Sequence, residues 1–386
     1  MSHEDVAQTS MSTARRLIMT EDQEALRAAV RDLLRDHAPW ASVLARTESD
    51  TPYDIGLWGR LGDLGVTSLL IPQEYGGSGG DARDLAVVCE QLGAFVAPVP
   101  FCGSAVLATA ALVAVRSEPV AADLLGKLAS GELTAALAIP ATSVPGAVLS
   151  TTVLAEDGKL TGIVTPVLDL WGADLVIVLA LDEGQAALYA VQADEFDFPL
   201  VQPITALDLT RQVASLELAA NPARLIVRGE PALAAVATAV VTGAAMLAAE
   251  QVGVAQWSLD TTVAYLKERY QFGRPIGSFQ ALKHRMAHVW RRLGLARAAA
   301  IAAADALAAE NDPDEIATVV AVAASYCSET AVFAAEEMIQ LHGGIGMTWE
   351  HPAHLYLGRA KADELILGAP DQHRARLAEL VSLPAP

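Results

Sequence analysis

The sequence predicts an α+β fold in which a β-rich segment separates two helical segments. Apolar residues recur with helical spacing near the start of the chain, turn-flanked apolar runs occupy the middle, and long alanine-rich stretches follow. We expect an N-terminal helical domain over 1–132, a middle antiparallel β-domain over 133–228 and a C-terminal four-helix bundle over 229–386.

The first helix is predicted to begin after Thr20. Thr20 and Gln23 have the spacing of a capping box, in which each side chain bonds the other residue's backbone N–H. Leu26, Val30 and Leu33 then recur on one face, as the core-facing residues of an amphipathic helix do.

Turn residues divide the middle segment into strands. Glu183-Gly184 separates the apolar runs 175–179 and 187–191, and this arrangement predicts a β-hairpin. Leu216 and Leu218 alternate with Ser215 and Glu217, which indicates a half-buried strand.

The last segment is predicted to be helical. Asp312-Pro313 provides a helix cap and a proline at the first helical position, between two alanine-rich stretches typical of adjacent bundle helices. The uncharged run between Glu230 and Glu250 is long enough to span a membrane. Its alanine, valine and threonine content, with Gly243 inside, favours a buried bundle helix instead.

Composition excludes some functions. The net charge of -20 argues against a nucleic-acid partner, which needs clustered lysine and arginine, but leaves room for a small anion held by a few local groups. The 3 cysteines are scattered and predict buried thiols in a reducing compartment. The polar N-terminus shows no signal-peptide pattern, so we expect a cytoplasmic protein that does not bind a membrane.

Two stretches contain candidate ligand-binding residues. One runs from Arg269 to Gln280 and includes Phe272, where an arginine beside a helix break could pair with a phosphate and an aromatic ring could cover a ligand ring. The other, His342-Gly343-Gly344-Ile345-Gly346, could direct backbone N–H groups at an anion. Taken alone, the first could equally be an interhelix turn and the second a glycine helix stop.

Together the two stretches resemble the signatures of the acyl-CoA dehydrogenase family. The pattern Arg-x-x-Phe-Gly-x-Pro-Ile-x-x-Phe-Gln is its helical-domain signature, and His-Gly-Gly-x-Gly is its second. Asp63-Leu64-Gly65 and Tyr75-Gly76-Gly77 resemble its N-terminal region, so the likeness covers nearly the whole chain. The resemblance implies the acyl-CoA dehydrogenase fold.

The resemblance also implies an activity and partners. Members of the family oxidise the Cα–Cβ bond of an acyl-CoA thioester: a carboxylate takes the α-proton, FAD takes the β-hydride, and electrons pass to an electron-transferring flavoprotein. They are usually tetramers in which each FAD lies across a dimer interface. The neighbouring subunit contributes contacts to the pyrophosphate and adenine. The positions matching those contacts are Arg269, Gln271, Phe272, Gln280, Gln340, Leu341, Gly343 and Gly344.

The catalytic base of the family is missing from its expected positions. Most members place a glutamate where this chain has Leu367, within Ile366-Leu367-Gly368-Ala369. A minority place it on the helix before the first signature, at a position that corresponds to Gly243. Neither residue has a side chain that can accept a proton.

The segments expected beside the flavin ring also depart from the family pattern. The stretch 139–146 has neither the Thr-Glu pair nor the Gly-Ser-Asp of active members, and Val167-Leu168-Asp169 replaces Trp-Ile-Thr. Contacts for a neighbour's FAD are therefore kept, whereas those for the chain's own FAD are lost.

This one-sided loss resembles the non-catalytic chain of the α2β2 acyl-CoA dehydrogenases that actinobacteria use on steroid side-chain CoA esters. We therefore expect a second dehydrogenase subunit as the partner. Two alternatives remain: a homomeric dehydrogenase or oxidase with a relocated base at Asp363, Glu364 or Asp371, and a non-enzymatic scaffold. Glu250 lies two helical turns after Gly243 and about 10 Å farther along the axis.

Overall fold

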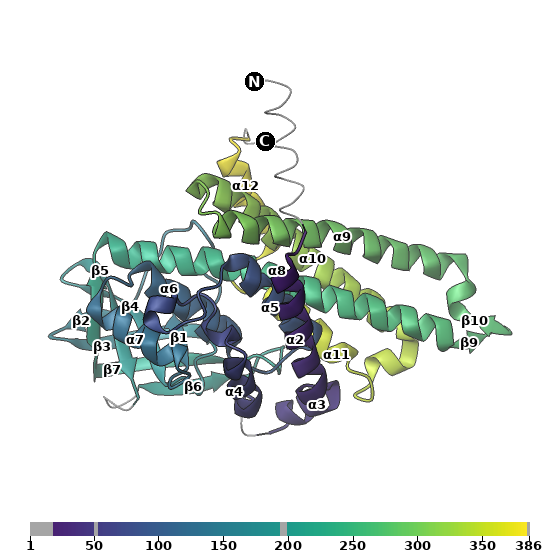
Figure 1. Cartoon of the computed structure of the whole chain (residues 1–386), viewed down its shortest axis with the longest axis horizontal. Helices are drawn as coiled ribbons and strands as arrows, with labels where there is room; N and C mark the ends of the chain where they lie inside the picture. Colours follow the sequence, from purple (N-terminus) through teal and green to yellow (C-terminus); the bar gives the residue numbers. More distant parts are fainter. Residues whose placement is uncertain (1–17, 50–52, 194–198, 384–386) are drawn as a thin grey trace.

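The computed structural model describes residues 18–49, 53–193 and 199–383 and shows a β-domain beside a helical body from which a long arm extends (Figure 1). The helices before the sheet are α2 (Glu21–His37), α3 (Trp40–Thr47), α4 (Ile55–Asp63), α5 (Ala82–Ala94), α6 (Thr109–Ala114) and α7 (Pro119–Ala129). Between them lie the short 3-10 turns η1 (Val66–Ser68) and η2 (Gln73–Tyr75) and the π-helical segment η3 (Phe101–Ala108).

Helix α2 begins where the sequence predicts. The Thr20 side chain accepts a hydrogen bond from the Gln23 backbone, and the Gln23 side chain accepts one from the Thr20 backbone, which completes the capping box. Val30 and Leu34 on its inner face are fully buried.

The middle of the chain forms one mixed sheet. Its strands are β1 (Ala135–Ala138), β2 (Leu154–Glu156), β3 (Lys159–Leu168), β4 (Leu175–Asp182), β5 (Gln185–Gln192), β6 (Leu200–Ile204), β7 (Val213–Pro222) and β8 (Arg224–Arg228), in the order β6-β7-β3-β2-β4-β5-β8 with β1 also on β4.

The predicted hairpin is present as β4 and β5, joined through Glu183 and Gly184, both at positive φ. Most neighbouring strands are antiparallel, as expected. The exceptions are β1 and β2, which both pair with β4 in parallel. Strand β1 pairs with the first half of β4 and β2 with its last two residues, so the chain follows β4 in one direction and leaves the sheet only between these two strands.

The C-terminal part consists of three long helices and two short ones. These are α8 (Glu230–Glu268), α9 (Gln280–Ala308), α10 (Pro313–His342), α11 (Ala353–Asp363) and α12 (Pro370–Leu380). Asp312 caps α10 as predicted. A small hairpin of β9 (Tyr270–Gln271) and β10 (Arg274–Pro275), followed by η4 (Ile276–Ser278), links α8 to α9 at the tip of the arm (Figure 1).

Helix α8 is the central element of the molecule. A Cβ atom added to Gly253 would lie 1.9 Å from the Glu90 carbonyl oxygen, so the backbones of α8 and α5 are in direct contact. Both α8 and α10 are long and apolar enough to cross a membrane by length and composition. However, 72% and 56% of the relevant windows are buried inside this chain, as a core helix requires. Cys89, Cys102 and Cys327 are buried free thiols, as the sequence predicts.

Candidate functional site

The first signature forms the tip of the arm. Helix α8 ends at Glu268, and the Ile276 N–H donates to the Arg269 carbonyl oxygen at 2.7 Å, which closes the turn. Phe272 lies in the turn at φ +54° and is 90% exposed. Arg269, Gln271 and Gln280 are exposed as well. An exposed aromatic at a positive φ is unfavourable for an isolated chain, so this conformation points to a function outside its own core.

The second signature follows the end of α10. Gly343 adopts φ +62° and opens the short turn η5 (Gly343–Met347). A Cβ atom added to Gly343 or Gly344 would meet nothing within 4 Å, so the backbone there is open to a ligand. Gln340 is exposed, whereas the Leu341 side chain is buried, which leaves only its backbone available to a ligand.

Tyr265 joins the two signatures. It lies one helical turn before Arg269, and its ring stacks on that of His342 with centroids 4.4 Å apart. Its hydroxyl donates to the His342 carbonyl oxygen at 3.4 Å, directly before Gly343. The His342 ring in turn packs against His351 at 4.3 Å. Two stretches more than sixty residues apart therefore form one surface at the end of the arm.

The two expected base positions meet inside the molecule. A Cβ atom added to Gly243 would lie 2.6 Å from terminal carbons of both Leu107 and Leu367. Leu367 is 1% exposed. By resemblance, positions 243 and 367 correspond to the two alternative places of the catalytic glutamate, and the structure brings them together. The space that a carboxylate would need is filled by the Leu107 and Leu367 side chains.

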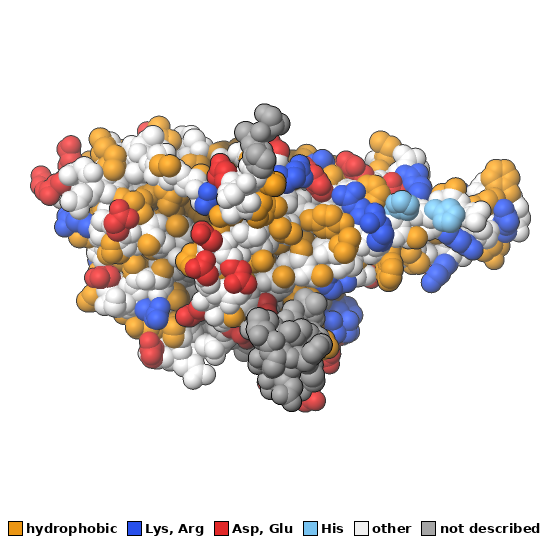
Figure 2. Space-filling model, turned by 90° about the horizontal axis from the view of Figure 1, so that it is seen from above, with side chains coloured by type: hydrophobic (Ala, Val, Ile, Leu, Met, Phe, Trp, Pro, Cys, Tyr) orange, Lys and Arg blue, Asp and Glu red, His pale blue; other side chains and the backbone are white. Residues whose placement is uncertain are grey.

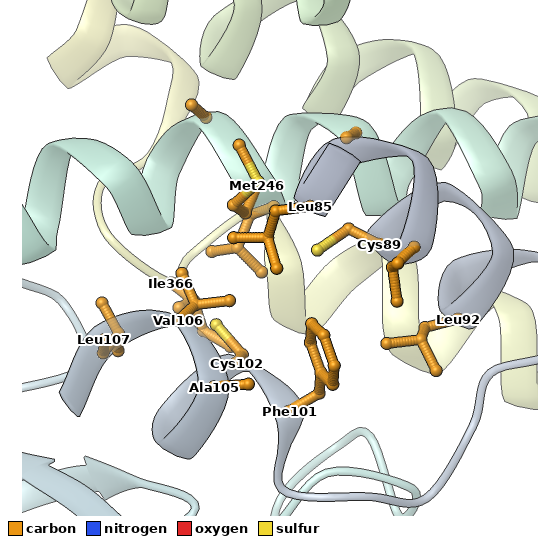
Figure 3. Close-up of a cluster of buried hydrophobic side chains, with 14 of the residues drawn as sticks. Leu85, Cys89, Leu92, Phe101, Cys102, Ala105, Val106, Leu107, Met246 and Ile366 are labelled. Carbon is orange, nitrogen blue, oxygen red and sulfur yellow. The ribbon is translucent and has the colours of Figure 1, made fainter. Parts of the chain in front are cut away.

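A packed apolar cluster extends from this contact (Figure 3). Helix α5, η3, α8 and the segment after α11 contribute buried side chains to it, among them Leu85, Phe101, Val106, Met246 and Ile366. Cys89 and Cys102 lie in the same cluster, where burial raises the pKa of both thiols and keeps them protonated. The cluster therefore has neither an open acyl pocket nor a reactive group among the described residues.

The segments expected beside a flavin ring contact each other directly. The Leu367 N–H donates to the Ala141 carbonyl oxygen, and the Ala141 N–H donates to that of Pro166, both at 2.7 Å. A Cβ atom added to Gly368 would lie 3.3 Å from the Val144 side chain. These contacts do not fit an isoalloxazine ring between the two segments.

Asp169, one of the replacements for the Trp-Ile-Thr segment, points into the N-terminal helices. Its carboxylate accepts hydrogen bonds from the Gly103 N–H at 2.7 Å and from the Tyr53 hydroxyl. Burial raises the pKa of Asp169 although Arg211 and these donors oppose the rise. Asp169 thus ties the β-domain to the N-terminal helices.

A buried ionic network lies next to the apolar cluster. Glu250 of α8 pairs with Arg211 at 2.5 Å and with Arg359 of α11, and Arg359 also pairs with Asp208 at 2.5 Å. Asp363 lies 3.3 Å from Arg211. Burial raises the pKa of Glu250, but the two guanidinium groups outweigh this and hold the pKa below its ordinary value. Burial raises the pKa of Asp363 well above its ordinary value.

The carboxylates considered as relocated bases have other environments. Glu250 and Asp363 are buried in the network because α8, α11 and the 205–212 segment converge there. Glu364 pairs with Lys361 at 3.3 Å, and Asp371 is exposed in the first turn of α12. None of these four carboxylates is one of the residues of the Gly243–Leu367 contact.

Comparison with protein families matches two parts of the chain. Residues 20–132 match the acyl-CoA dehydrogenase N-terminal domain, and residues 233–381 match the acyl-CoA dehydrogenase C-terminal domain. The acyl-CoA dehydrogenase IpdE2 of Mycolicibacterium smegmatis is 35% identical over 93% of this chain and 98% of that protein. The acyl-CoA dehydrogenase FadE34 of Mycobacterium tuberculosis is 35% identical over 94% of this chain but only 48% of that protein.

Solved structures share the fold over nearly the full length. The ChsE4-ChsE5 complex from Mycobacterium tuberculosis matches with a TM-score of 0.83 and 26% identity, over 96% of this chain and 100% of that one. A variant of the steroid ACAD Tcur3481-Tcur3483 matches with a TM-score of 0.82 and 28% identity, over 94% of this chain and 98% of that one.

Proposed function

Since this chain belongs to the acyl-CoA dehydrogenase family, whose members are oxidoreductases acting on the CH–CH bond of acyl-CoA, we propose that it is the non-catalytic subunit of a two-chain dehydrogenase. Its arm supplies FAD contacts to a partner subunit that carries the catalytic base. The proposed assembly is an α2β2 heterotetramer, as the resemblance to the two-chain dehydrogenases implies.

The contrast between the two halves of the site carries this proposal. The Gly243–Leu367 contact is closed by Leu107, whereas Arg269, Phe272 and the Gly343-Gly344 backbone are exposed together. An enzyme that had simply lost its activity would be expected to lose both sets of residues, because selection would no longer keep either of them. A subunit that only donates contacts keeps one half.

The residues of the arm have the chemistry that a dinucleotide needs. Arg269 and the Gly343 and Gly344 amides would hold the pyrophosphate, because a guanidinium and converging N–H groups both favour phosphate oxygens. Phe272 would cover a ring, and Gln271, Gln280 and Gln340 would hydrogen-bond the adenosine half, with the Leu341 backbone beside them. Bound FAD supplies the hydride acceptor for oxidation of the acyl chain.

The relatives suggest the substrate and the partner. The similar structures include a complex of two chains, ChsE4-ChsE5, and one described as a steroid ACAD. A steroid side-chain CoA thioester is therefore the proposed substrate class, with a second acyl-CoA dehydrogenase chain as partner. An electron-transferring flavoprotein is the proposed electron acceptor.

The visible spectrum of the purified chain tests the proposal. Expressed alone, the chain should be colourless or hold far less than one FAD per chain, and it should not turn over acyl-CoA. Co-expression with the second dehydrogenase chain should give a yellow complex with one FAD per pair of chains. One FAD per chain, bleached by acyl-CoA without a partner, would contradict it.

A further inference from the structure

The charges of this chain are segregated along the sequence. Although the chain has 46 acidic and only 26 basic residues, no aspartate or glutamate occurs from 269 to 304. The basic residues of this stretch are Arg269, Arg274, Lys283, Arg285, Arg291, Arg292 and Arg297. The stretch comprises the tip of the arm and most of α9, so in a strongly acidic protein this helix has no acidic side chain before Asp305.

Some of these cations have partners inside the chain. Arg285 pairs with Glu337 of α10 at 2.6 Å, and Arg297 pairs with Glu90 of α5 at 3.0 Å. The Arg292 guanidinium lies 4.8 Å from the centre of the Phe333 ring. These arginines lie beside the buried apolar face of α9, to which Met286, Val289 and Leu293 belong.

The outer face of α9 is different. Lys283, His284, His288 and Arg291 are exposed on it. The first acidic residue of α9 is Asp305, more than three turns after Arg291, and it pairs with Arg83. Figure 2 shows lysine, arginine and histidine side chains gathered along the arm, which α9 forms on this side of the molecule. We call this surface, with the apolar residues described next, the α9 face.

Apolar side chains lie among these cations. Trp290 is 70% exposed and Leu295 is 52% exposed. A Cβ atom added to Gly294 would meet nothing within 4 Å, so packing within the described chain does not require this glycine, which costs the helix about 1 kcal/mol relative to alanine. A large aromatic with small residues beside it is the pattern of a contact surface rather than of a solvated helix.

We infer that the α9 face is a docking surface for an acidic face of the second dehydrogenase chain. This inference rests on the proposed function, which requires such a chain. Trp290 and Leu295 supply the apolar centre, and Lys283 and Arg291 pair with carboxylates of the partner. A groove lies beside the α9 face, and its α8 side carries both acidic and basic residues: Asp260, Lys267 and Glu268. The positive charge that would select an acidic partner therefore lies on α9.

A second copy of this chain does not fit the same surface. A two-fold axis through the α9 face would bring each cation opposite its own kind, and like charges across an interface cost several kcal/mol. A head-to-tail contact with an acidic surface of another copy would give a ring or an open filament, and neither is the paired arrangement that the proposed function needs. The α9 face therefore favours a hetero-oligomer over a homo-oligomer.

Zero-length cross-linking tests the inference. The tagged full-length chain is purified with its associated proteins from the cells that naturally make it, treated with a carbodiimide, and analysed by mass spectrometry. This reagent couples an amine only to a carboxylate in contact with it. Lys283 should be joined to an aspartate or glutamate of an acyl-CoA dehydrogenase chain with a different sequence.

Matched variants measure the contribution of the face. Lys283→Glu with Arg291→Glu should lower recovery of the partner chain about tenfold or more, because both pairs become repulsive. Trp290→Ala should weaken binding by about 30-fold, as loss of an interface anchor does. Arg31→Glu, on the exposed face of α2, is the control and should leave recovery unchanged. All variants should keep the wild-type melting temperature, since the altered residues are exposed.

The outcomes separate this inference from the proposed function. Recovery of a second dehydrogenase chain that neither cross-links to Lys283 nor responds to the charge reversal would overturn the docking surface and leave the two-chain enzyme intact. Cross-links from Lys283 to a second copy, or to an electron-transferring flavoprotein, would also overturn it. A homo-oligomer with one FAD per chain and acyl-CoA turnover would overturn the proposed function itself.

Discussion

The middle of α8 and its C-terminal end have opposite surroundings. In the middle, Gly243 is enclosed by Leu107 and Leu367, and Glu250 is held by two arginines. At its C-terminal end the helix continues into Arg269 and the exposed Phe272. One continuous helix of 39 residues therefore links a closed interior to an open arm about 30–40 Å away.

The difference indicates that residues of the interior and residues of the arm are kept for different reasons. In the interior, the side chains that fill the base position stabilise the chain by burial, which benefits the isolated subunit. At the arm, exposed arginine, phenylalanine and glycine do not stabilise it, and Phe272 at positive φ carries a local cost. Because these groups do not stabilise the isolated chain, we expect them to contact another molecule.

The largest expected effect concerns the buried network. Arg359→Met should lower the free energy of unfolding by about 3–5 kcal/mol, because Glu250 and Asp208 would be left as buried carboxylates with incomplete pairing. Chemical denaturation measures this. Arg285→Met, which breaks the part-exposed pair with Glu337, is the control and should cost no more than about 1 kcal/mol. Equal losses would mean that the network does not stabilise the interior.

Restoring the base should not restore the enzyme. Leu367→Glu should lower the free energy of unfolding by about 3 kcal/mol, because a carboxylate would be buried against Gly243 and Leu107 without a partner. Leu367→Met keeps the volume and should cost less than about 1.5 kcal/mol. Neither variant, expressed alone, should bleach flavin with acyl-CoA. Turnover by Leu367→Glu would show that the interior is open to substrate.

The arm should respond in the opposite way. In the two-chain complex, Arg269→Ala should weaken FAD binding by about 10- to 100-fold, the loss expected for a charged hydrogen bond to phosphate, with little change in stability. Flavin release measured by fluorescence gives the affinity. Lys267→Ala, exposed two residues earlier, is the control. Unchanged affinity in Arg269→Ala would remove Arg269 from the proposed site.

Acid should weaken the packing around His351. Burial, together with the neighbouring His342 and His354, lowers the pKa of His351 from 6.5 to about 4. Above pH 6.5 His351 is neutral in both states; as the pH falls from 6.5 towards 4 the unfolded chain binds the proton first, so stability is lost in this window. The loss should be about 1–2 kcal/mol after allowance for solvent. His351→Phe should show a shallower decline of melting temperature between these pH values, and an unchanged slope would assign the acid sensitivity to other groups.

Local features of the fold could be predicted from the sequence. The Thr20–Gln23 capping box, the Asp312 cap and the β4–β5 hairpin depend on neighbouring residues, so their patterns are visible in a short window. The parallel pairing of β1 and β2 with β4 depends on how distant segments meet, and no local pattern encodes it.

The candidate site divides in the same way. The signatures around Arg269 and Gly343 are each contiguous in sequence, and their exposure agrees with the predicted role in binding. The ionic network was missed because Arg211, Glu250 and Arg359 lie far apart in sequence and only tertiary packing brings them together. One signal was available, namely the isolated Glu250 after a long uncharged helical run, since a charge there needs a buried partner.

The smallest expected effect separates the proposed subunit from a homomeric enzyme with a relocated base. Glu364→Gln and Asp371→Asn should leave the activity of the two-chain complex unchanged and stability within about 0.5 kcal/mol, because one pairs with Lys361 and the other is exposed. Steady-state acyl-CoA oxidation measures both. Asp363→Asn is the matched buried variant: it should keep activity as well, because Asp363 faces Arg211 in the network. Loss of turnover in any of the three, at full FAD occupancy and unchanged melting temperature, would identify the relocated base and move catalysis into this chain.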